Sequence, residues 1–130
     1  MGQEAKVIHL DANILISAAN KNSQVETLLR NWLQQGEIFA ASSIAWAEFL
    51  NGPVDPQQVL KVDNLIEGRI VTFGRVEAQM AAVLFNATGR KRGSRPDCFI
   101  AATAICAKVP LATQDRQDFA AFVGAGLRLV

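Results

Sequence analysis

The segment Lys6–Asn20, KVIHLDANILISAAN, is the part of the sequence that most clearly indicates the fold. Its first five residues, 6–10, are typical of a short β-strand that is bounded by Asp11. The apolar residues from Ile14 onward are typical of the start of a helix. A strand that leads directly into a helix is the repeating unit of parallel α/β sheets.

The same alternation of short strand-forming segments and longer helical segments continues along the chain. It predicts strands at 6–10, 37–42, 69–73, 109–113 and 127–130. It predicts helical segments at 14–20, 25–35, 44–50, 56–67, 75–88 and 95–107. Because no repeat, linker or low-complexity tract interrupts this order, we expect residues 1–130 to form one α/β domain. Its sheet should be mainly parallel, with helices on both faces.

The composition of the 130 residues is typical of a folded protein with little net charge. Half of the residues are hydrophobic and only four are proline, which argues against disorder. The net charge of +1 provides no overall basic field, so a nucleic-acid partner would need a local basic patch. No apolar run approaches the roughly eighteen residues of a membrane helix, and residues 1–6 lack the apolar core of a signal peptide. We therefore expect a cytoplasmic protein with no membrane partner.

The cysteines and the histidine argue against two classes of site. Cys98 and Cys106 fall in one predicted helix, about 12 Å apart along its axis, which is too far for a disulfide. They are interpreted as small buried groups in a reducing compartment. His9 is the single histidine and lies in a predicted strand, so a histidine-rich zinc site is excluded and a Ser-His-Asp triad is disfavoured. We expect His9 to be structural.

Four of the twelve acidic residues have unusual positions relative to the predicted elements. Asp11 follows the first strand, and Glu48 lies among apolar residues on the helix entered from the second strand. Asp97 opens a long apolar helix, and Asp115 follows a late strand. Ligands of parallel sheets bind beyond the carboxyl ends of the strands. The topology therefore predicts that these four carboxylates meet at one edge of the sheet.

Four carboxylates in a partly dry cleft raise one another's pKa values unless cations neutralise them. Mg²⁺ and Mn²⁺ prefer oxygen ligands and retain several waters. A bound ion of this kind can polarise a phosphoryl oxygen and lower the pKa of a water molecule. The acidic set therefore favours phosphodiester hydrolysis, a reaction that requires no histidine.

Each acid taken alone also has a structural interpretation. Asp11 could be a turn or helix-cap residue, Glu48 a solvated helix residue, and Asp115 part of a surface turn. Ser94 and Asp97 have the spacing of a capping box, in which Asp97 would satisfy the backbone N–H groups of the helix start. Four separate structural roles do not explain why all four acids fall at one edge of the sheet. The functional interpretation explains this shared location, and it is therefore favoured.

Four segments of the chain, taken in order, resemble the PIN-domain family, and in size the chain resembles the VapC-type toxins. The matching segments are VIHLDANILI (7–16), SSIAWAEFLNG (42–52), RPDCFIAATAI (95–105) and LATQDRQDF (111–119). The resemblance implies an α/β/α sandwich around a parallel sheet and the activity of a metal-dependent endoribonuclease. It also implies an RNA substrate, a homodimer and a small antitoxin protein that inserts a peptide near the active cleft.

The resemblance also implies which residues form the site. The acidic pocket that binds Mg²⁺ or Mn²⁺ and performs catalysis would comprise Asp11, Glu48, Asp97 and Asp115. The supporting polar residues that orient the acids would be Asn13 and Thr113.

The chain departs from the family pattern near this site. Ala12 stands where many relatives carry Thr or Ser, and the bulky Trp46 could restrict access to the pocket. Asp118 competes with Asp115 for the fourth acidic position. Asp115 is preferred because it lies two residues after Thr113 at the strand exit, whereas Asp118 is expected to cap the next helix.

A basic run, GRKRGSR at 89–95, lies just before Asp97. Its cations are Arg90, Lys91, Arg92 and Arg95. The run could hold RNA phosphates over the acids. It could also be a solvated loop or help to dock an acidic antitoxin segment. Because the run lies close to Asp97, we favour contact with RNA.

Three other functions fit the sequence less well. A receiver-like domain would need paired acids after the first strand and a late lysine at a strand end, whereas Asn13 replaces an acid and Lys108 precedes its strand. Haloacid-dehalogenase chemistry would need Asp-x-Asp, which the sequence Asp-Ala-Asn denies. A non-catalytic PIN-fold binding module, acting through protein or RNA contacts, would have no reason to retain four mutually repelling carboxylates.

Overall fold

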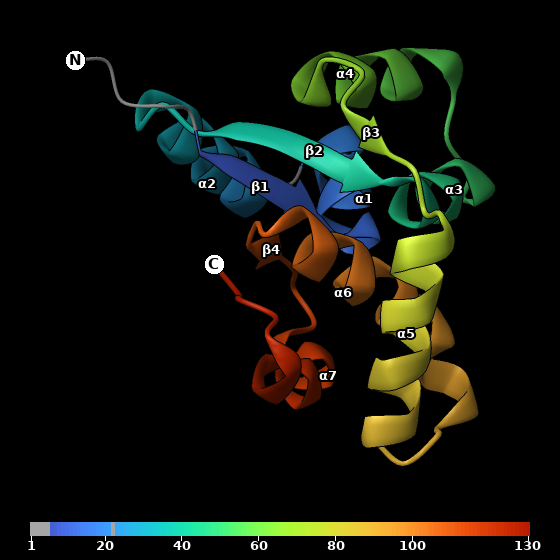
Figure 1. Cartoon of the computed structure of the whole chain (residues 1–130). Helices are drawn as coiled ribbons and strands as arrows, with labels where there is room; N and C mark the ends of the chain where they lie inside the picture. The colour runs from blue at the N-terminus through green and yellow to red at the C-terminus, as the bar shows by residue number, and fades with distance from the viewer. Residues whose placement is uncertain (1–5, 22) are drawn as a thin grey trace.

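The computed structural model describes residues 6–21 and 23–130 (Figure 1). Its strands are β1 (Val7–Leu10), β2 (Ile38–Ser42), β3 (Ile70–Val71) and β4 (Leu111–Ala112). Its α-helices are α1 (Ala12–Ala19), α2 (Ser23–Gln34), α3 (Ser43–Asn51), α4 (Pro56–Ile66), α5 (Arg75–Ala87), α6 (Arg95–Ala107) and α7 (Arg116–Phe119). Two 3₁₀ helices, η1 (Arg92–Ser94) and η2 (Ala120–Ala125), complete the chain order.

The sheet has the strand order β3-β2-β1-β4, and all three neighbouring pairs are parallel. The central strand β1 pairs with β2 on one side, where Val7 lies opposite Ile38, and with β4 on the other, where His9 lies opposite Leu111. The expected α/β class with a parallel sheet is therefore confirmed. Parallel order places the carboxyl ends of β1, β2 and β4 at the same edge.

The strand expected at 127–130 is wrong. Leu129 forms only an isolated parallel bridge with Leu111, whose N–H donates to Arg128 O and whose carbonyl accepts from Val130 N–H. The neighbouring strand β4 is only two residues long, and the preceding Pro110 has no N–H to donate. A longer ladder therefore has no partner to pair with.

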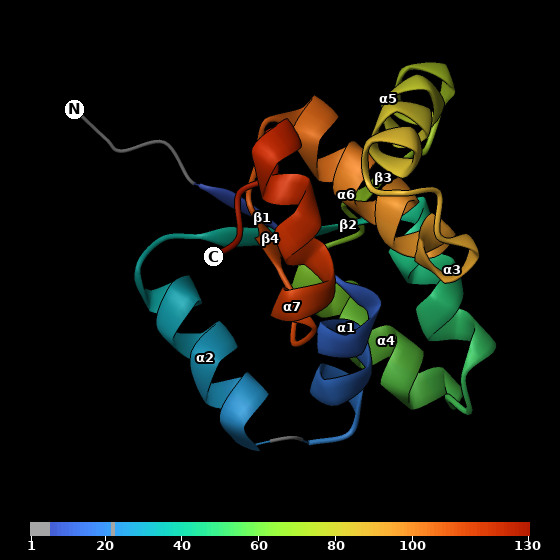
Figure 2. The same cartoon turned by 90° about the horizontal axis from the view of Figure 1, so that it is seen from below.

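Helices cover both faces of the sheet (Figure 2). α1, α2 and α4 lie on one face, and α5 and α6 lie on the other. α5 and α6 pack along each other as a hairpin that extends beyond the sheet (Figure 1). The expected α/β/α sandwich is thus present. Among the described residues, no helix is long and apolar enough to cross a bilayer.

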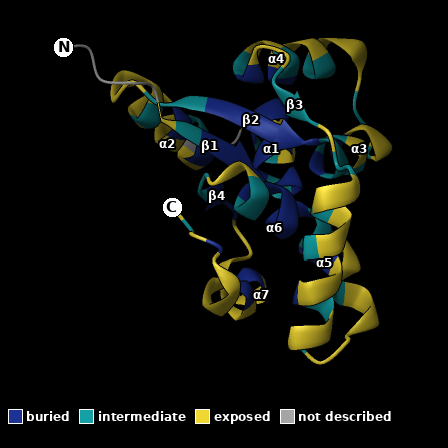
Figure 3. Cartoon of the chain, viewed as in Figure 1, coloured by how far each residue is buried: buried dark blue, intermediate teal, exposed yellow. Residues whose placement is uncertain are grey.

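The core lies between the sheet and these helices, where the strands are buried and the outer sides of the helices are exposed (Figure 3). Leu10, Phe39, Phe49 and Leu111 are completely buried. Two helices start directly at strand ends because a polar residue caps each of them. Asp11 caps α1 after β1, and Ser42 Oγ accepts from the Ala45 N–H at the start of α3 after β2.

Candidate active site

The carboxyl edge of the sheet brings the predicted acids together from four separate parts of the chain. Asp11 lies between β1 and α1, and Glu48 projects from α3. Asp97 lies in the first turn of α6, and Asp115 immediately precedes α7. The charges of Asp11, Glu48 and Asp115 each raise the pKa of Asp97, so all four side chains share one electrostatic environment.

Asp11 is held in a fixed orientation at the centre of this edge. It is 5% exposed, and both of its carboxylate oxygens accept hydrogen bonds. Oδ1 accepts from the Ala12 N–H at 2.8 Å, and Oδ2 accepts from Thr113 Oγ1 at 2.7 Å. Burial and the charge of Asp115 raise the pKa of Asp11, whereas these two hydrogen bonds lower it. The balance is an upward shift, which shows that the negative charge is incompletely compensated.

Asn13 and Thr113 connect Asp11 to Asp115. Asn13 Nδ2 donates to Asp115 Oδ2 at 3.2 Å and to Thr113 Oγ1 at 3.4 Å, while its Oδ1 accepts from the Gln114 N–H. Thr113 Oγ1 also accepts from the Asp115 N–H at 3.0 Å. Thr113 thus contacts both acids, and Asn13 ties α1 to the segment that follows β4. This arrangement can fix the rotamers of two carboxylates.

Asp97 has the most strongly shifted carboxyl group in this cluster. Burial, which is the largest cause, and the charges of Asp11, Asp118, Glu48 and Asp115, in that order, together raise its pKa to about 6. No opposite charge contributes to the shift. Asp97 is therefore a carboxylate that is surrounded by other carboxylates.

The capping-box interpretation of Ser94 and Asp97 is wrong. Ser94 Oγ donates to the Lys91 carbonyl at 2.7 Å and lies 3.8 Å from Cys98 Sγ. Among the described residues it makes no side-chain capping bond to α6. The reason is the preceding turn η1, which places Ser94 in a helical conformation, whereas a capping residue is extended.

Glu48 reaches the same edge from α3 and is half-buried. Burial is the larger cause and the charge of Asp11 the smaller cause of the rise in its pKa. Trp46, on the same helix, packs against Phe49 with ring centroids 5.3 Å apart. That contact holds one face of the indole against the core.

Asp118 occupies a different position from the one expected. It lies inside α7, where its N–H donates to the carbonyl of Asp115, so it does not cap this helix. Its charge raises the pKa of Asp97 more than that of Asp115 does. The spacing of the two acids in Asp-Arg-Gln-Asp is i, i+3, which places both on one side of a helical turn. That spacing is the signal that could have added Asp118 to the acidic set.

A cavity of about 610 Å³ opens beside Asp97. The turn between α5 and α6 forms one wall, and α7 with η2 forms the other. The residues that line it are Thr88, Lys91, Gly93, Ser94, Asp97, Gln117, Asp118, Ala121 and Phe122. The acidic edge therefore continues into a hollow that is large enough for a small ligand.

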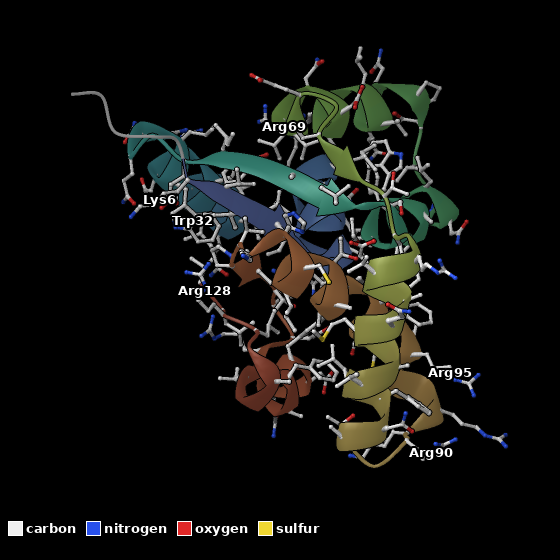
Figure 4. The ribbon with its side chains drawn as sticks, viewed as in Figure 1. Lys6, Trp32, Arg69, Arg90, Arg95 and Arg128 are labelled. Carbon is white, nitrogen blue, oxygen red and sulfur yellow. The ribbon has the colours of Figure 1, made fainter. Side chains whose placement is uncertain are left out.

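The basic run divides between two surfaces. Lys91 lines the cavity beside Asp97. Arg90 and Arg95 each place the guanidinium carbon 5.6 Å from the centre of the Phe85 ring, a cation–π distance. Both point outward from the end of the α5–α6 hairpin (Figure 4). Arg92 lies in η1 and is exposed. Lys91 is thus the member of the run that is closest in the fold to the acidic pocket.

The carboxylates suit an oxygen-binding divalent cation in their chemistry but are not arranged as a finished site. Among the described residues, no three His, Cys, Asp or Glu side chains stand close enough together to hold a metal ion. The raised pKa values of Asp11, Glu48 and Asp97 nevertheless reflect negative charge that a cation would compensate. All available donors are oxygens, which are the ligands that Mg²⁺ and Mn²⁺ prefer.

Comparison with known proteins supports the same assignment of fold. The family model of the PIN domain matches residues 8–124. No curated protein matches the chain.

Three solved structures are similar over most of their length. VapBC2 from Rickettsia felis, bound to a DNA fragment from its promoter, is 25% identical with a TM-score of 0.72, covering 95% of this chain and 97% of the other. A toxin-antitoxin complex from Klebsiella pneumoniae is 25% identical with a TM-score of 0.70, covering 87% and 90%. FitAcB from Neisseria gonorrhoeae shares the fold at 24% identity, with a TM-score of 0.69 and coverage of 94% and 95%.

Proposed function

This chain belongs to the PIN-domain family, and we propose that it is a metal-dependent endoribonuclease that acts as the toxin of a toxin–antitoxin pair. The observation that carries this proposal is the environment of Asp97, whose pKa is raised to about 6 by burial and by four other carboxylates. A carboxylate cluster without a cationic side chain to compensate it costs folding free energy. A catalytic role with a bound cation explains why such a cluster is present.

In this proposal the residues that hold Mg²⁺ or Mn²⁺ are Asp11, Glu48, Asp97 and Asp115. Asp118 joins them because it is among the acids that act on Asp97. A divalent cation would neutralise these acids and polarise the phosphodiester. Since the side chains repel one another when the cation is absent, its binding would draw them together.

The protein groups around the cation have separate tasks. Thr113 and Asn13 orient Asp11 and Asp115 through the hydrogen bonds described above. Asp97, whose pKa is raised to about 6 in the cation-free protein, would be kept ionised by the bound cation and would serve as one of its ligands. Lys91 contributes positive charge for the RNA backbone, and the remaining arginines of the run add long-range attraction.

The proposed partners follow from the similar complexes. VapBC2 and the complex from Klebsiella pneumoniae each pair a toxin with an antitoxin, and we expect a cognate antitoxin for this chain. We also propose a homodimer, for which the exposed Val76 and Val83 on α5 provide apolar surface. Cleavage of cellular RNA would take place in the cytoplasm.

The proposal is tested by incubating pooled RNA with the purified protein in Mn²⁺ and in EDTA. We expect cleavage that requires the metal. The cleavage rate should fall by about a hundredfold or more in Asp11→Asn, as is typical when a group that acts on the reacting atoms is removed. Asn is as good a helix cap as Asp, so circular dichroism should show that the variant remains folded. Equal cleavage by both proteins would contradict the proposal. RNA binding without cleavage would instead support the non-catalytic binding module.

A further inference from the structure

The cavity beside Asp97 extends well beyond the carboxylates. Its volume of about 610 Å³ lies within the range of about 300–1,000 Å³ that holds small ligands, and a phosphodiester group alone would fill only part of it. On the side away from Asp97 it is lined by Thr88 and Gly93 from the hairpin end and by Gln117 and Ala121 from α7 and η2. The hollow therefore has room for a group attached to the phosphate.

We propose that this cavity binds one unstacked nucleotide of single-stranded RNA next to the cleaved bond, with Lys91 on its phosphate and Gln117 on its base. The inference rests on the proposed endoribonuclease function, because it names the substrate contacts of the same site.

Lys91 is the group that can attract a phosphate into this space. Among the described residues that line the cavity it is the only cation, and it stands with Asp97 and Asp118. The two carboxylates repel an approaching phosphate. The ammonium group of Lys91 offsets this repulsion and therefore strengthens phosphate binding. Arg90 and Arg95 are engaged with Phe85 and do not line the cavity. The phosphate contact is therefore assigned to Lys91.

Gln117 is the group that can recognise a base. Its side chain is exposed, and it makes no hydrogen bond with any residue that the structure describes. A glutamine amide carries both a donor and an acceptor, which matches the paired donor and acceptor on a base edge. The exposed Ala121 supplies an apolar contact beside it for a base, above the buried Phe122.

The shape of the cavity selects single-stranded RNA. It lies between the hairpin end and α7, so a base must leave its stack to enter. Sequence-specific RNA recognition usually targets unpaired bases, whereas the deep major groove of an RNA duplex is closed to side chains. A duplex would keep its bases out of reach of Gln117.

The experiment has two readouts, the sequence of the cut sites and the salt dependence of binding. A random single-stranded RNA pool is cleaved in Mn²⁺ and the product ends are sequenced. Gln117→Ala should lower cleavage at the sites that the wild type prefers and lose about tenfold of the preference at one nucleotide beside the cut, the size of one lost base contact. Gln34→Ala, on the distant helix α2, is the matched control and should keep the wild-type preference.

Binding is measured by fluorescence anisotropy with a labelled single strand in metal-free buffer. Lys91→Ala should weaken all sequences equally and reduce the slope of log K against log salt by about 0.7, as expected when one phosphate contact is lost. Lys6→Ala, a lysine at the opposite end of β1, is the matched control and should keep the slope (Figure 4). The same sequence presented as a duplex should bind more weakly than the single strand.

Each failure points to a different part of the account. If the wild type cleaves RNA but shows no base preference, or if Gln117→Ala keeps it, base reading by Gln117 is overturned. An unchanged salt slope in Lys91→Ala, or equal binding of the duplex and the single strand, overturns the proposed nucleotide site. Neither outcome affects the proposed endoribonuclease function. Absence of cleavage by the wild type contradicts the proposed function, and the anisotropy measurement then decides the nucleotide site by itself.

Discussion

At the scale of single residues, the site is defined by charges that lack compensation. The protein partly compensates the charge of Asp11, because each of its carboxylate oxygens accepts a hydrogen bond. The pKa of Asp11 nevertheless remains raised. Asp97 has a pKa of about 6 because burial and neighbouring acids act in the same direction. Residues of this kind are typical of functional sites, where pKa values depart from their ordinary range.

His9 presents the opposite case of a buried group that stays neutral. Burial lowers its pKa from 6.5 to about 4, and its Nδ1 has no hydrogen-bond partner among the described residues. Between pH 6.5 and 4 the unfolded chain binds a proton that the folded protein excludes, so His9 makes stability fall as the pH falls through this window. Above pH 6.5 it has no such effect.

The prediction is that His9→Phe reduces this acid-dependent loss by about 3 kcal/mol, the equivalent of 2.5 pKa units. The free energy of unfolding of both proteins is measured in urea at pH 7, 5 and 4. The difference between variant and wild type should move in favour of the variant as the pH falls. A constant difference across these pH values would show that His9 is not the group that titrates.

At the scale of elements, the starts of the helices decide where the polar groups of the site lie. The cap of α3, Ser42, is the last residue of β2, the cap of α1, Asp11, directly follows β1, and both caps are buried and hydrogen-bonded. α6 begins after η1, and its first turn contains an acid that belongs to the site.

This difference predicts unequal effects of two serine substitutions. Ser42→Ala should cost about 1 kcal/mol because it removes the cap of α3 at a completely buried position. Ser94→Ala should cost less than about 0.5 kcal/mol, since its hydroxyl makes no cap to α6 and bonds the Lys91 carbonyl in the exposed turn, with only a weak 3.8 Å contact to Cys98 Sγ. Urea unfolding of both variants measures the two costs. Equal costs would restore Ser94 as the cap of α6.

The elements that could be predicted from the sequence are those with strong local signals. β1 and β2 have buried residues along most of their length, and the helices show apolar residues at helical spacing. The expected strands at 69–73 and 109–113 are reduced to Ile70–Val71 and Leu111–Ala112, and 127–130 forms a single bridge. The extent of an edge strand depends on packing against its cross-strand neighbours, which the local sequence does not contain.

The acidic edge was equally predictable because it follows from topology. Asp11, Asp115 and the helix that carries Glu48 follow β1, β4 and β2, whose carboxyl ends share one edge, and the turn before α6 brings Asp97 to the same edge. The place of Asp118 depends on the short helix α7, whose start cannot be located from four residues of sequence. The division of the basic run likewise depends on Phe85, against which Arg90 and Arg95 lie while Lys91 lines the cavity.

At the scale of the whole molecule, the outer side of α5 is the most exposed helical surface of the hairpin (Figure 3). Val76 and Val83 are 62% and 57% exposed and lie seven residues apart, on the same side of the helix. Exposed apolar residues aligned in this way are consistent with an interface in the proposed homodimer.

If α5 forms that interface, Val83→Glu should convert a dimer into a monomer. Light scattering should give twice the monomer mass for the wild type and the monomer mass for the variant. Leu60→Glu, at a comparably exposed site on α4, is the control and should remain dimeric. Both substitutions should change folding stability by less than about 0.5 kcal/mol because the side chains are exposed. A dimer that persists in Val83→Glu would place the interface elsewhere.

Thermal unfolding with and without Mn²⁺ tests whether the acidic edge is a cation-binding catalytic pocket. The wild type and Asp97→Asn are compared in the same buffer. A ligand that binds only the folded protein stabilises it, by about 2.7 kcal/mol at a hundred times its Kd. We predict that Mn²⁺ raises the Tm of the wild type and has little effect on Asp97→Asn. Without metal, the variant should be at least as stable as the wild type because one repelling charge is gone. If Mn²⁺ changes neither Tm and the variant is less stable than the wild type, Asp97 is a structural residue and the account is contradicted.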